Sequence, residues 1–262
     1  MVRIDDQTLA CPIYLYRNVE KAAAGDSAGG SGFLVGIQVD EWVFIYAVTN
    51  AHVIGEGFAV VRLNSQSGGT EIIDASAGPW FVHTTGDVAI CEIEAGEEHH
   101  SKCLPESMFI TGEELAFHGI GPGNEIFMVG RFVNLEGKVQ NTPALRFGTV
   151  AIMPIEPMKD PRGNDALMYV IEMHSISGFS GSPVFVHILP FEGKPMFGSY
   201  GYKGGQAFGP KLLGIDCGHV RGTVENTGMS AVVRVEALQE LLNRDDVGEA
   251  RRKAIAQQSE TI

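Results

Sequence analysis

The chain carries the stretch Gly178-Phe179-Ser180-Gly181-Ser182-Pro183, followed at once by Val184-Phe185-Val186. A serine stands there between glycines, and a proline and an apolar, strand-like run come next. A nucleophilic hydroxyl needs such a tight turn, which exposes its oxygen and aims backbone N–H groups at the point where a carbonyl oxygen gains negative charge. Gly178 permits the positive φ that this turn requires. The alternative is an ordinary loop before a strand, since glycine, serine and proline are the usual turn residues.

Two further residues bear on that choice, because a serine hydroxyl needs a base and a group that orients the base. His52 closely follows the apolar run 42–48, at the end of a predicted strand where the chain turns into a short helix or loop. Its alternative is a histidine packed in the core. Asp87 stands at the mouth of the apolar run 88–93, and its alternative is a turn with its own backbone. The order His, Asp, Ser is that of the chymotrypsin-type arrangement, so we predict a catalytic triad of His52, Asp87 and Ser180.

With these motifs the chain resembles the trypsin-like (chymotrypsin-fold) serine peptidases, and among them the bacterial glutamyl endopeptidases and stress-response proteases. The matching segments are 30–36 for the first core strand, 48–53 for the base, 86–90 for the orienting Asp, 178–185 for the nucleophile and 212–215 for the strand after it. The resemblance covers residues 30 to 243, most of the chain.

The resemblance implies an all-β fold of two six-stranded antiparallel β-barrels with a C-terminal α-helix. Short apolar runs supply candidate strands at 12–16, 33–35, 42–48, 58–63 and 88–93 for the first barrel, and at 125–129, 145–150, 168–172, 184–186 and 212–215 for the second. The polar and Gly/Pro-rich region 97–123 is the predicted link. We therefore predict an N-terminal barrel over 1–110, a C-terminal barrel with its helix over 111–245, and a polar tail over 246–262.

Two smaller regions carry local expectations. Val235, Leu238, Leu241 and Leu242 recur at helical spacing and predict an amphipathic helix over 234–244, whereas the charged residues from 245 onward are expected to fray. The pair His99-His100 is read as part of a solvated loop, since adjacent positions rarely converge on one metal ion.

The resemblance also assigns roles to the residues around the nucleophile. The amides of Gly178 and Ser180 would form the oxyanion hole, and no cofactor or metal would be needed. The substrate pocket would be framed by His174 and by the strand Asp216-Cys217-Gly218-His219. Glutamyl endopeptidases place a histidine where this chain has Asp216, which leaves three alternatives. His174 and His219 contact an acidic substrate side chain, Asp216 favours a basic one, or the polar groups satisfy each other and the pocket is small.

Two departures from the family pattern stand near the site. Digestive relatives carry an Asp directly before the nucleophile, which pairs with a newly cut N-terminus, and this chain has Phe179. We therefore expect constitutive competence or control by another route, such as a regulatory protein partner or a loop movement. The long segment 189–211 is rich in glycine and aromatic residues, and it is either a mobile recognition flap or an extended hairpin.

Composition limits the other function classes. The 262 residues carry a net charge of −13, which disfavours nucleic acid as a partner and could favour basic substrates. The N-terminus lacks the pattern of a secretory signal, and no apolar run approaches the length of a membrane span. We therefore predict a cytoplasmic location without membrane contact. The cysteines are scattered, and Cys91 and Cys217 fall in or beside apolar runs where buried thiols are expected.

The sequence is compatible with three functions. The first is a serine endopeptidase that hydrolyses polypeptide substrates through an acyl-enzyme. The second is a catalytically silent trypsin-like domain that acts as a protein-interaction module. The third is an esterase that uses the same three residues.

Overall fold

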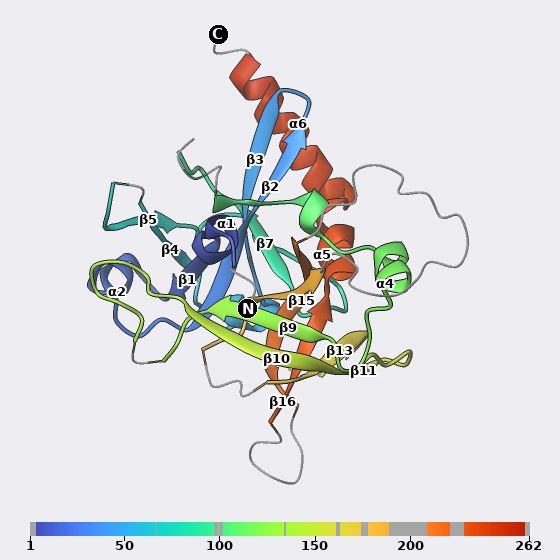
Figure 1. Cartoon of the computed structure of the whole chain (residues 1–262). Helices are drawn as coiled ribbons and strands as arrows, with labels where there is room; N and C mark the ends of the chain where they lie inside the picture. Colours follow the sequence, from blue (N-terminus) through green and yellow to red (C-terminus); the bar gives the residue numbers. More distant parts are fainter. Residues whose placement is uncertain are drawn as a thin grey trace.

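A computed structural model describes residues 4–65, 67–96, 99, 102–133, 135–160, 163–173, 178–188, 209–220 and 228–259. Within these residues the chain forms two large, mostly antiparallel sheets that lie against each other, with helices at the margins (Figure 1). No helix among them combines the length and the apolar character needed to cross a bilayer. The predicted cytoplasmic location and the domain boundary at residue 110 stay predictions.

The N-terminal sheet has the strand order β5-β4-β1-β2-β3-β7-β6, and β8 pairs with β2. Its strands are β1 (Pro12–Tyr16), β2 (Gly30–Val39), β3 (Trp42–Thr49), β4 (Val60–Asn64), β5 (Thr70–Asp74), β6 (Phe81–Val82), β7 (Ala89–Glu92) and β8 (Leu104–Pro105). The longest pairing joins β2 to β3, from Phe33 opposite Val48 to Val39 opposite Trp42, and the tip of this hairpin projects from the body (Figure 1).

The prediction of a six-stranded first barrel is wrong for this sheet. The sheet is eight-stranded and open, with β5 at one edge and β6 at the other. One edge strand is only two residues long, and the other is half-exposed along its length, so neither offers the other a buried face on which to close. Apolar runs located the central strands, but a run does not encode whether the first and last strands meet.

The C-terminal sheet is a closed six-stranded barrel, as predicted, with the order β10-β13-β16-β15-β14-β9. Its strands are β9 (Glu125–Gly130), β10 (Ala144–Ile152), β13 (Met168–Glu172), β14 (Pro183–Ile188), β15 (Gly209–His219) and β16 (Met229–Arg234). The pattern of apolar runs had not singled out β16. Two further short strands, β11 (Met158–Lys159) and β12 (Asp165–Ala166), pair with each other.

The helices are short except at the C-terminus. They are α1 (Asp6–Ala10), α2 (Val19–Ala24), α3 (Ala51–Gly55), the 3-10 helix η2 (Glu106–Met108), α4 (Gly112–His118), α5 (Val235–Leu242) and α6 (Asp245–Ser259). The four residues whose spacing predicted this helix, Val235, Leu238, Leu241 and Leu242, are all buried, which confirms the predicted amphipathic helix. Part of the expected link between the sheets, 97–123, is the helix α4.

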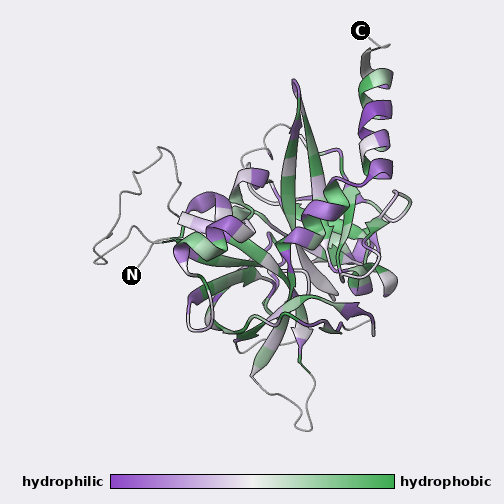
Figure 2. Ribbon diagram, turned by 90° about the vertical axis from the view of Figure 1, so that its right-hand side faces the viewer, coloured by the Kyte–Doolittle hydropathy of each residue, from purple (hydrophilic) through white to green (hydrophobic). Residues whose placement is uncertain are grey.

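The expectation of a frayed tail is wrong for residues 245–259, which form α6. This helix is largely polar and extends past the body of the molecule (Figure 2). Val247 anchors its first turns in the core, and the guanidinium of Arg251 lies over the ring of Tyr46 and donates to the carbonyl of Leu242. The prediction of a frayed tail rested on the charged and polar composition of this segment, which gives no information about these few anchoring contacts.

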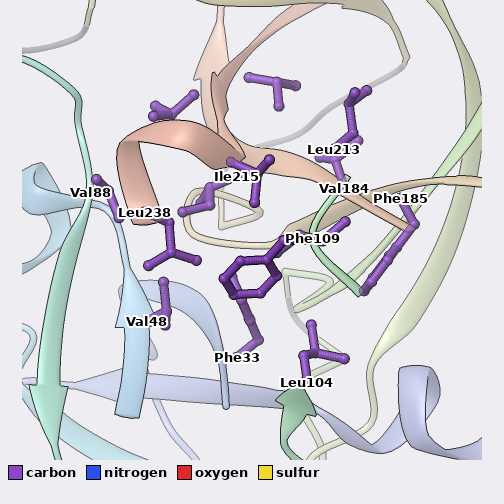
Figure 3. Close-up of a cluster of buried hydrophobic side chains, with 14 of the residues drawn as sticks. Phe33, Val48, Val88, Leu104, Phe109, Val184, Phe185, Leu213, Ile215 and Leu238 are labelled. Carbon is purple, nitrogen blue, oxygen red and sulfur yellow. The ribbon is translucent and has the colours of Figure 1, made fainter. Parts of the chain in front are cut away.

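A single apolar core joins the two sheets. Side chains from β2, β3, β8, β14, β15 and α5 meet in it, and Figure 3 shows them converging from both sides. Labelled members are Phe33, Val48, Val88, Leu104, Phe109, Val184, Phe185, Leu213, Ile215 and Leu238. Because strands of both sheets share this core, the segments that carry His52, Asp87 and Ser180 are held in a fixed relation.

Buried polar groups correct one further expectation and confirm another. His99 is fully buried, and its Nε2 lies 2.6 Å from Oε2 of Glu71 on β5, so it is not part of a solvated loop. The partner is distant in the sequence, which is why the local polar composition gave no sign of it. All four cysteines, Cys11, Cys91, Cys103 and Cys217, are buried and free, as predicted for two of them.

Arg62 on β4 is a fully buried cation that ties the two halves of the chain together. It donates to the carbonyl oxygens of Gly137 and Lys138 and to the side-chain oxygen of Asn141, at 2.7–3.0 Å. The amide group of Asn141 donates in return to the carbonyl of Arg62. The guanidinium thus fixes a turn from the C-terminal half to β4, with the buried side chain of Asn141 between them.

We predict that Arg62→Met lowers the free energy of unfolding by about 3 kcal/mol, because it removes all three hydrogen bonds and leaves the buried side-chain oxygen of Asn141 without this donor. Urea denaturation measures the effect. The exposed Arg252→Met is the matched control and should change stability by less than about 0.5 kcal/mol. Equal stability of the two variants would contradict this role for Arg62.

Candidate functional site

His52 lies in the first turn of α3, directly after β3. The helix begins at Ala51 with Asn50 as its N-cap in extended backbone, so the histidine is placed where an apolar strand ends. The imidazole is 20% exposed, so one face reaches solvent while the rest is packed. This is the placement that the sequence predicted.

Asp87 lies just before β7 and is fully buried. Its Oδ2 lies 2.6 Å from Nδ1 of His52, and its Oδ1 accepts a hydrogen bond of 3.0 Å from the backbone N–H of His52. Asn50 donates from its side chain to the Asp87 carbonyl at 2.7 Å. The carboxylate therefore holds both the ring and the backbone of His52, and Nδ1 carries the proton of the short bond.

The electrostatics of His52 follow from this contact. Burial of the imidazole lowers its pKa, but the hydrogen bond and the charge of Asp87 raise it, and the carboxylates of Glu56 and Asp216 add to the rise. The net result is a pKa above that of an ordinary histidine. A base of raised pKa is a stronger proton acceptor, which suits the removal of a proton from a hydroxyl.

Ser180 sits in a turn that its neighbouring glycines make possible. Gly178 has φ +100° and Gly181 has φ +89°, a region that side chains with a Cβ rarely adopt. A Cβ on Gly181 would also lie 2.0 Å from the carbonyl oxygen of Ser31. The amide of Ser182 donates to the carbonyl of Phe179 and closes the turn at 2.8 Å.

Strand β2 of the N-terminal sheet holds this turn from the opposite side. The amide of Ser31 donates to the carbonyl of Ser180 at 2.8 Å. At the adjacent Gly30, a Cβ would lie 2.9 Å from Val53, the neighbour of His52, and 3.3 Å from the carbonyl oxygen of Ser180. The structure thus brings the helix of His52 and the turn of Ser180 together at one point between the sheets.

The peptide groups of the turn are oriented by a chain of hydrogen bonds. Ser31 donates from Oγ to the carbonyl of Gly178 at 3.0 Å and accepts from the amide of Arg131 at 2.8 Å. Within the described part of the chain, the amides of Gly178 and Ser180 donate to no protein oxygen. Two free donors in a fixed turn can receive an oxyanion.

Arg131 adds a cation beside this turn. Its guanidinium pairs with Glu136 at 2.5 Å and lies so close to Gly178 that a Cβ there would be 2.4 Å from it. The motifs had not pointed to Ser31 or Arg131 as parts of the site. Ser31 does stand between two glycines in the quoted strand 30–36, a signal of close backbone approach, whereas nothing in the sequence links Arg131 to the turn.

Phe179 is fully buried in the place where digestive relatives carry an Asp. Its ring meets the edge of Phe132 at 6.4 Å, and the guanidinium of Arg146 lies 5.3 Å from its centroid. An apolar and cation–π contact thus occupies the position of a buried ion pair.

The pocket residues expected from the resemblance separate into two groups. Asp216 and Cys217 are buried, and the Cys217 thiol donates inward to the carbonyl of Ala231. Gly218 and His219 are half-buried, and a Cβ on Gly218 would lie 3.7 Å from Oγ of Ser180. His174 and residues 189–208 of the long insertion lie outside the described residues. Asp216 therefore does not present its carboxylate to solvent, while Gly218 leaves space beside the serine.

Metal binding finds no support in the part of the chain that is described, since no three His, Cys, Asp or Glu side chains gather there as a metal site.

Comparison with known proteins gives a fold but not a close relative. No protein-family model and no curated protein matches the chain. The MamO protease domain from Magnetospirillum magneticum superposes with a TM-score of 0.57 at 15% identity, covering 91% of this chain and 99% of that one. An inactive serine-to-alanine form of Rv3671c from M. tuberculosis H37Rv gives 0.53 at 13% identity, covering 92% and 94%.

A third match is a variant of the HtrA-type protease AlgW with a decapeptide, with a TM-score of 0.51 at 13% identity. It covers 83% of this chain and 52% of that one. The chain therefore has the trypsin-like serine protease fold. The matches do not reach the glutamyl endopeptidase branch, which stays a prediction.

We predict that Asp87→Asn lowers the pKa of His52, because it removes the charge that raises it. An NMR titration of the imidazole measures this directly and needs no turnover. The variant Asp74→Asn, an exposed aspartate on β5, is the control and should leave the His52 titration where it is. The assignment fails if His52 titrates identically with and without the Asp87 charge.

Proposed function

We propose that this protein is a serine endopeptidase, with Ser180 as nucleophile, His52 as general base and acid, and Asp87 as the group that orients the base. The contact of 2.6 Å between Nδ1 of His52 and the buried carboxylate of Asp87 carries the proposal. It fixes one tautomer, in which Nε2 is the lone-pair nitrogen free to accept a proton. The turn of Ser180 and the protease fold supply the rest of the support.

The reaction would proceed in two steps. Oγ of Ser180 bonds to the scissile carbonyl carbon while its proton passes to Nε2 of His52, and the carbonyl oxygen becomes an oxyanion held by the amides of Gly178 and Ser180. The proton then passes to the leaving amine as the C–N bond breaks, which leaves an acyl-enzyme. Water repeats the sequence and releases the acid. Each oxyanion donor contributes about 3–4 kcal/mol in comparable enzymes.

The space beside Gly218 supports a polypeptide as substrate. A Cβ on Gly218 would lie 3.7 Å from Oγ of Ser180, and the φ of +106° at this position is one that residues with a Cβ rarely adopt, so glycine keeps this side of the serine open to an extended chain. His219, also half-buried, is the pocket residue through which we propose that the substrate side chain is read. Recognition by His174 and the insertion 189–211 is part of the same proposal.

The silent interaction module is the second candidate, and one observation favours it. Among the described residues no hydrogen bond joins His52 to Oγ of Ser180. Catalytic hydrogen bonds of unliganded enzymes are often long and tighten only when substrate binds, so the enzyme remains our proposal. Covalent labelling separates the two candidates, and comparison of ester with peptide turnover separates the esterase.

A fluorophosphonate probe should label the wild type, and Ser180→Ala should abolish the labelling because the attacking oxygen is gone. Ser182→Ala is a close control, since its buried hydroxyl lies two residues further on in the same turn and should be dispensable for labelling. Labelled protein is detected by mass spectrometry. An unlabelled wild type would support the silent module instead.

The pH profile of kcat/KM on a peptide should lose activity as pH falls through the raised pKa of His52, because the base must be neutral to accept the proton. The midpoint of this acid limb should lie above the ordinary histidine value of 6.5. A peptide library cleaved at constant ionic strength gives both the profile and the side-chain preference. A limb centred well below that value would contradict the assigned base.

A further inference from the structure

Asp216 on β15 is a buried carboxyl group that neither the fold nor the proposed mechanism uses. Its side chain is fully buried, and Oδ1 accepts a hydrogen bond from Oγ of Ser230 on β16. The other oxygen, Oδ2, has no hydrogen-bond partner within the described part of the chain. A half-satisfied buried carboxyl costs free energy that an apolar residue would not, so a compensating role is expected.

The backbone of Asp216 holds the nucleophile turn. Its amide donates to the carbonyl of Ser182 at 2.9 Å, and its carbonyl accepts from the amide of Gly181 at 2.8 Å. The carboxyl group is therefore fixed to the same rigid unit as Ser180. Asp216 belongs to the C-terminal barrel and His52 to the N-terminal sheet. The charge of Asp216 nevertheless raises the pKa of His52, and the charge of His52 lowers the pKa of Asp216.

We propose that Asp216 is a second positioning residue for the base: from the C-terminal barrel, its carboxylate stabilises the imidazolium of His52 that Asp87 stabilises from the N-terminal sheet. The inference rests on the proposed function, in which that imidazolium forms when Ser180 gives up its proton. No proton passes to Asp216. Its part is to favour, by charge, the protonated state that the base reaches after the attack.

Within the described part of the chain, a small set of charged and polar groups faces the two side chains. His52 is faced by Asp87 before β7, by the exposed Glu56 at the end of α3, and by Asp216. Asp216 is faced by His52, by the hydroxyl of Ser230 and by the nearby amide of Gly218. Burial raises the pKa of Asp216 to about 6, against the opposing effects of these three groups. Asp216 therefore changes charge close to the pH range in which His52 does.

Burial of the Asp216 carboxyl makes the stability of the folded protein depend on pH. The pKa of Asp216 rises from 3.8 to about 6 on folding, so the folded state holds this proton more tightly than the unfolded state. Stability from this group therefore falls as pH rises between about 4 and 6, and the cost is fully present above that window. An isosteric neutral residue removes the cost.

The deciding variant is Asp216→Asn, which keeps the acceptor for Ser230 and loses the charge. In the wild type, kcat/KM should fall on the acid side more steeply than one proton allows over the range in which Asp216 also gains its proton, since activity is highest with both groups unprotonated. In the variant the limb should follow a single proton, its midpoint should move to lower pH, and kcat/KM at pH 8 should drop about tenfold.

Two readouts are independent of turnover. The NMR titration of His52 should move to lower pH in Asp216→Asn, and the denaturation midpoint at pH 8 should exceed that of the wild type. Glu56→Gln is the matched control, because its exposed charge is screened by salt and its effect on His52 should vanish at high ionic strength. The effect of Asp216 should persist there.

Ser230→Ala is a second variant in case the first does not fold. Loss of the Ser230 donor should raise the pKa of Asp216 and move the steep acid limb to higher pH. An unchanged His52 titration in an active Asp216→Asn enzyme would overturn the role of Asp216 alone. An inactive, unlabelled wild type would overturn the proposed function itself, and a single-proton limb in the wild type would again count against Asp216.

Discussion

The hydrogen bond from the amide of Ser31 to the carbonyl of Ser180 constrains the residues around the candidate site, because at 2.8 Å it joins a strand of the N-terminal sheet to the turn of Ser180 in the C-terminal barrel. So close an approach is possible only with glycine on both sides. A Cβ on Gly181 would strike the Ser31 carbonyl, and one on Gly30 would crowd Val53. Gly30 and Gly181 are therefore needed for the close contact between the two sheets, and Gly181 also for the turn of Ser180.

That contact explains why so few residues can assemble the site. His52 and Asp87 are locked together within the N-terminal sheet, and Ser180 is locked to β15 within the barrel. Ser31 bonds to Ser180 and to Gly178, and these two hydrogen bonds fix the position of the Ser180 turn relative to His52 and Asp87. Ser31 on β2 thus couples the position of the N-terminal sheet to the position of the Ser180 turn in the C-terminal barrel.

The parts of the site that are local in sequence could be predicted from it. His52 at the end of an apolar strand and Asp87 at the start of another were located because a strand end fixes where a side chain emerges, and the Gly-rich turn marked Ser180. The parts that depend on distant contacts could not be predicted. Closure of the first sheet depends on its edge strands, α6 depends on anchors such as Arg251, and the burial of His99 depends on Glu71. Each needs a partner that no local pattern names.

Two buried ionisable side chains, Arg62 and Asp216, differ in the contacts that they make. The terminal nitrogens of the Arg62 guanidinium donate to three oxygen acceptors and tie a turn to β4, while its Nε has no hydrogen-bond partner among the described residues. The carboxyl of Asp216 finds one donor and leaves an oxygen unpaired, so the fold does not account for it. A buried ionisable group that costs stability can persist where its charge serves a function, and in the proposed mechanism the charge of Asp216 favours the imidazolium of His52. The two groups therefore differ in what they contact: Arg62 binds a distant turn of the scaffold, whereas the backbone of Asp216 binds the turn of Ser180, at the site of the proposed reaction.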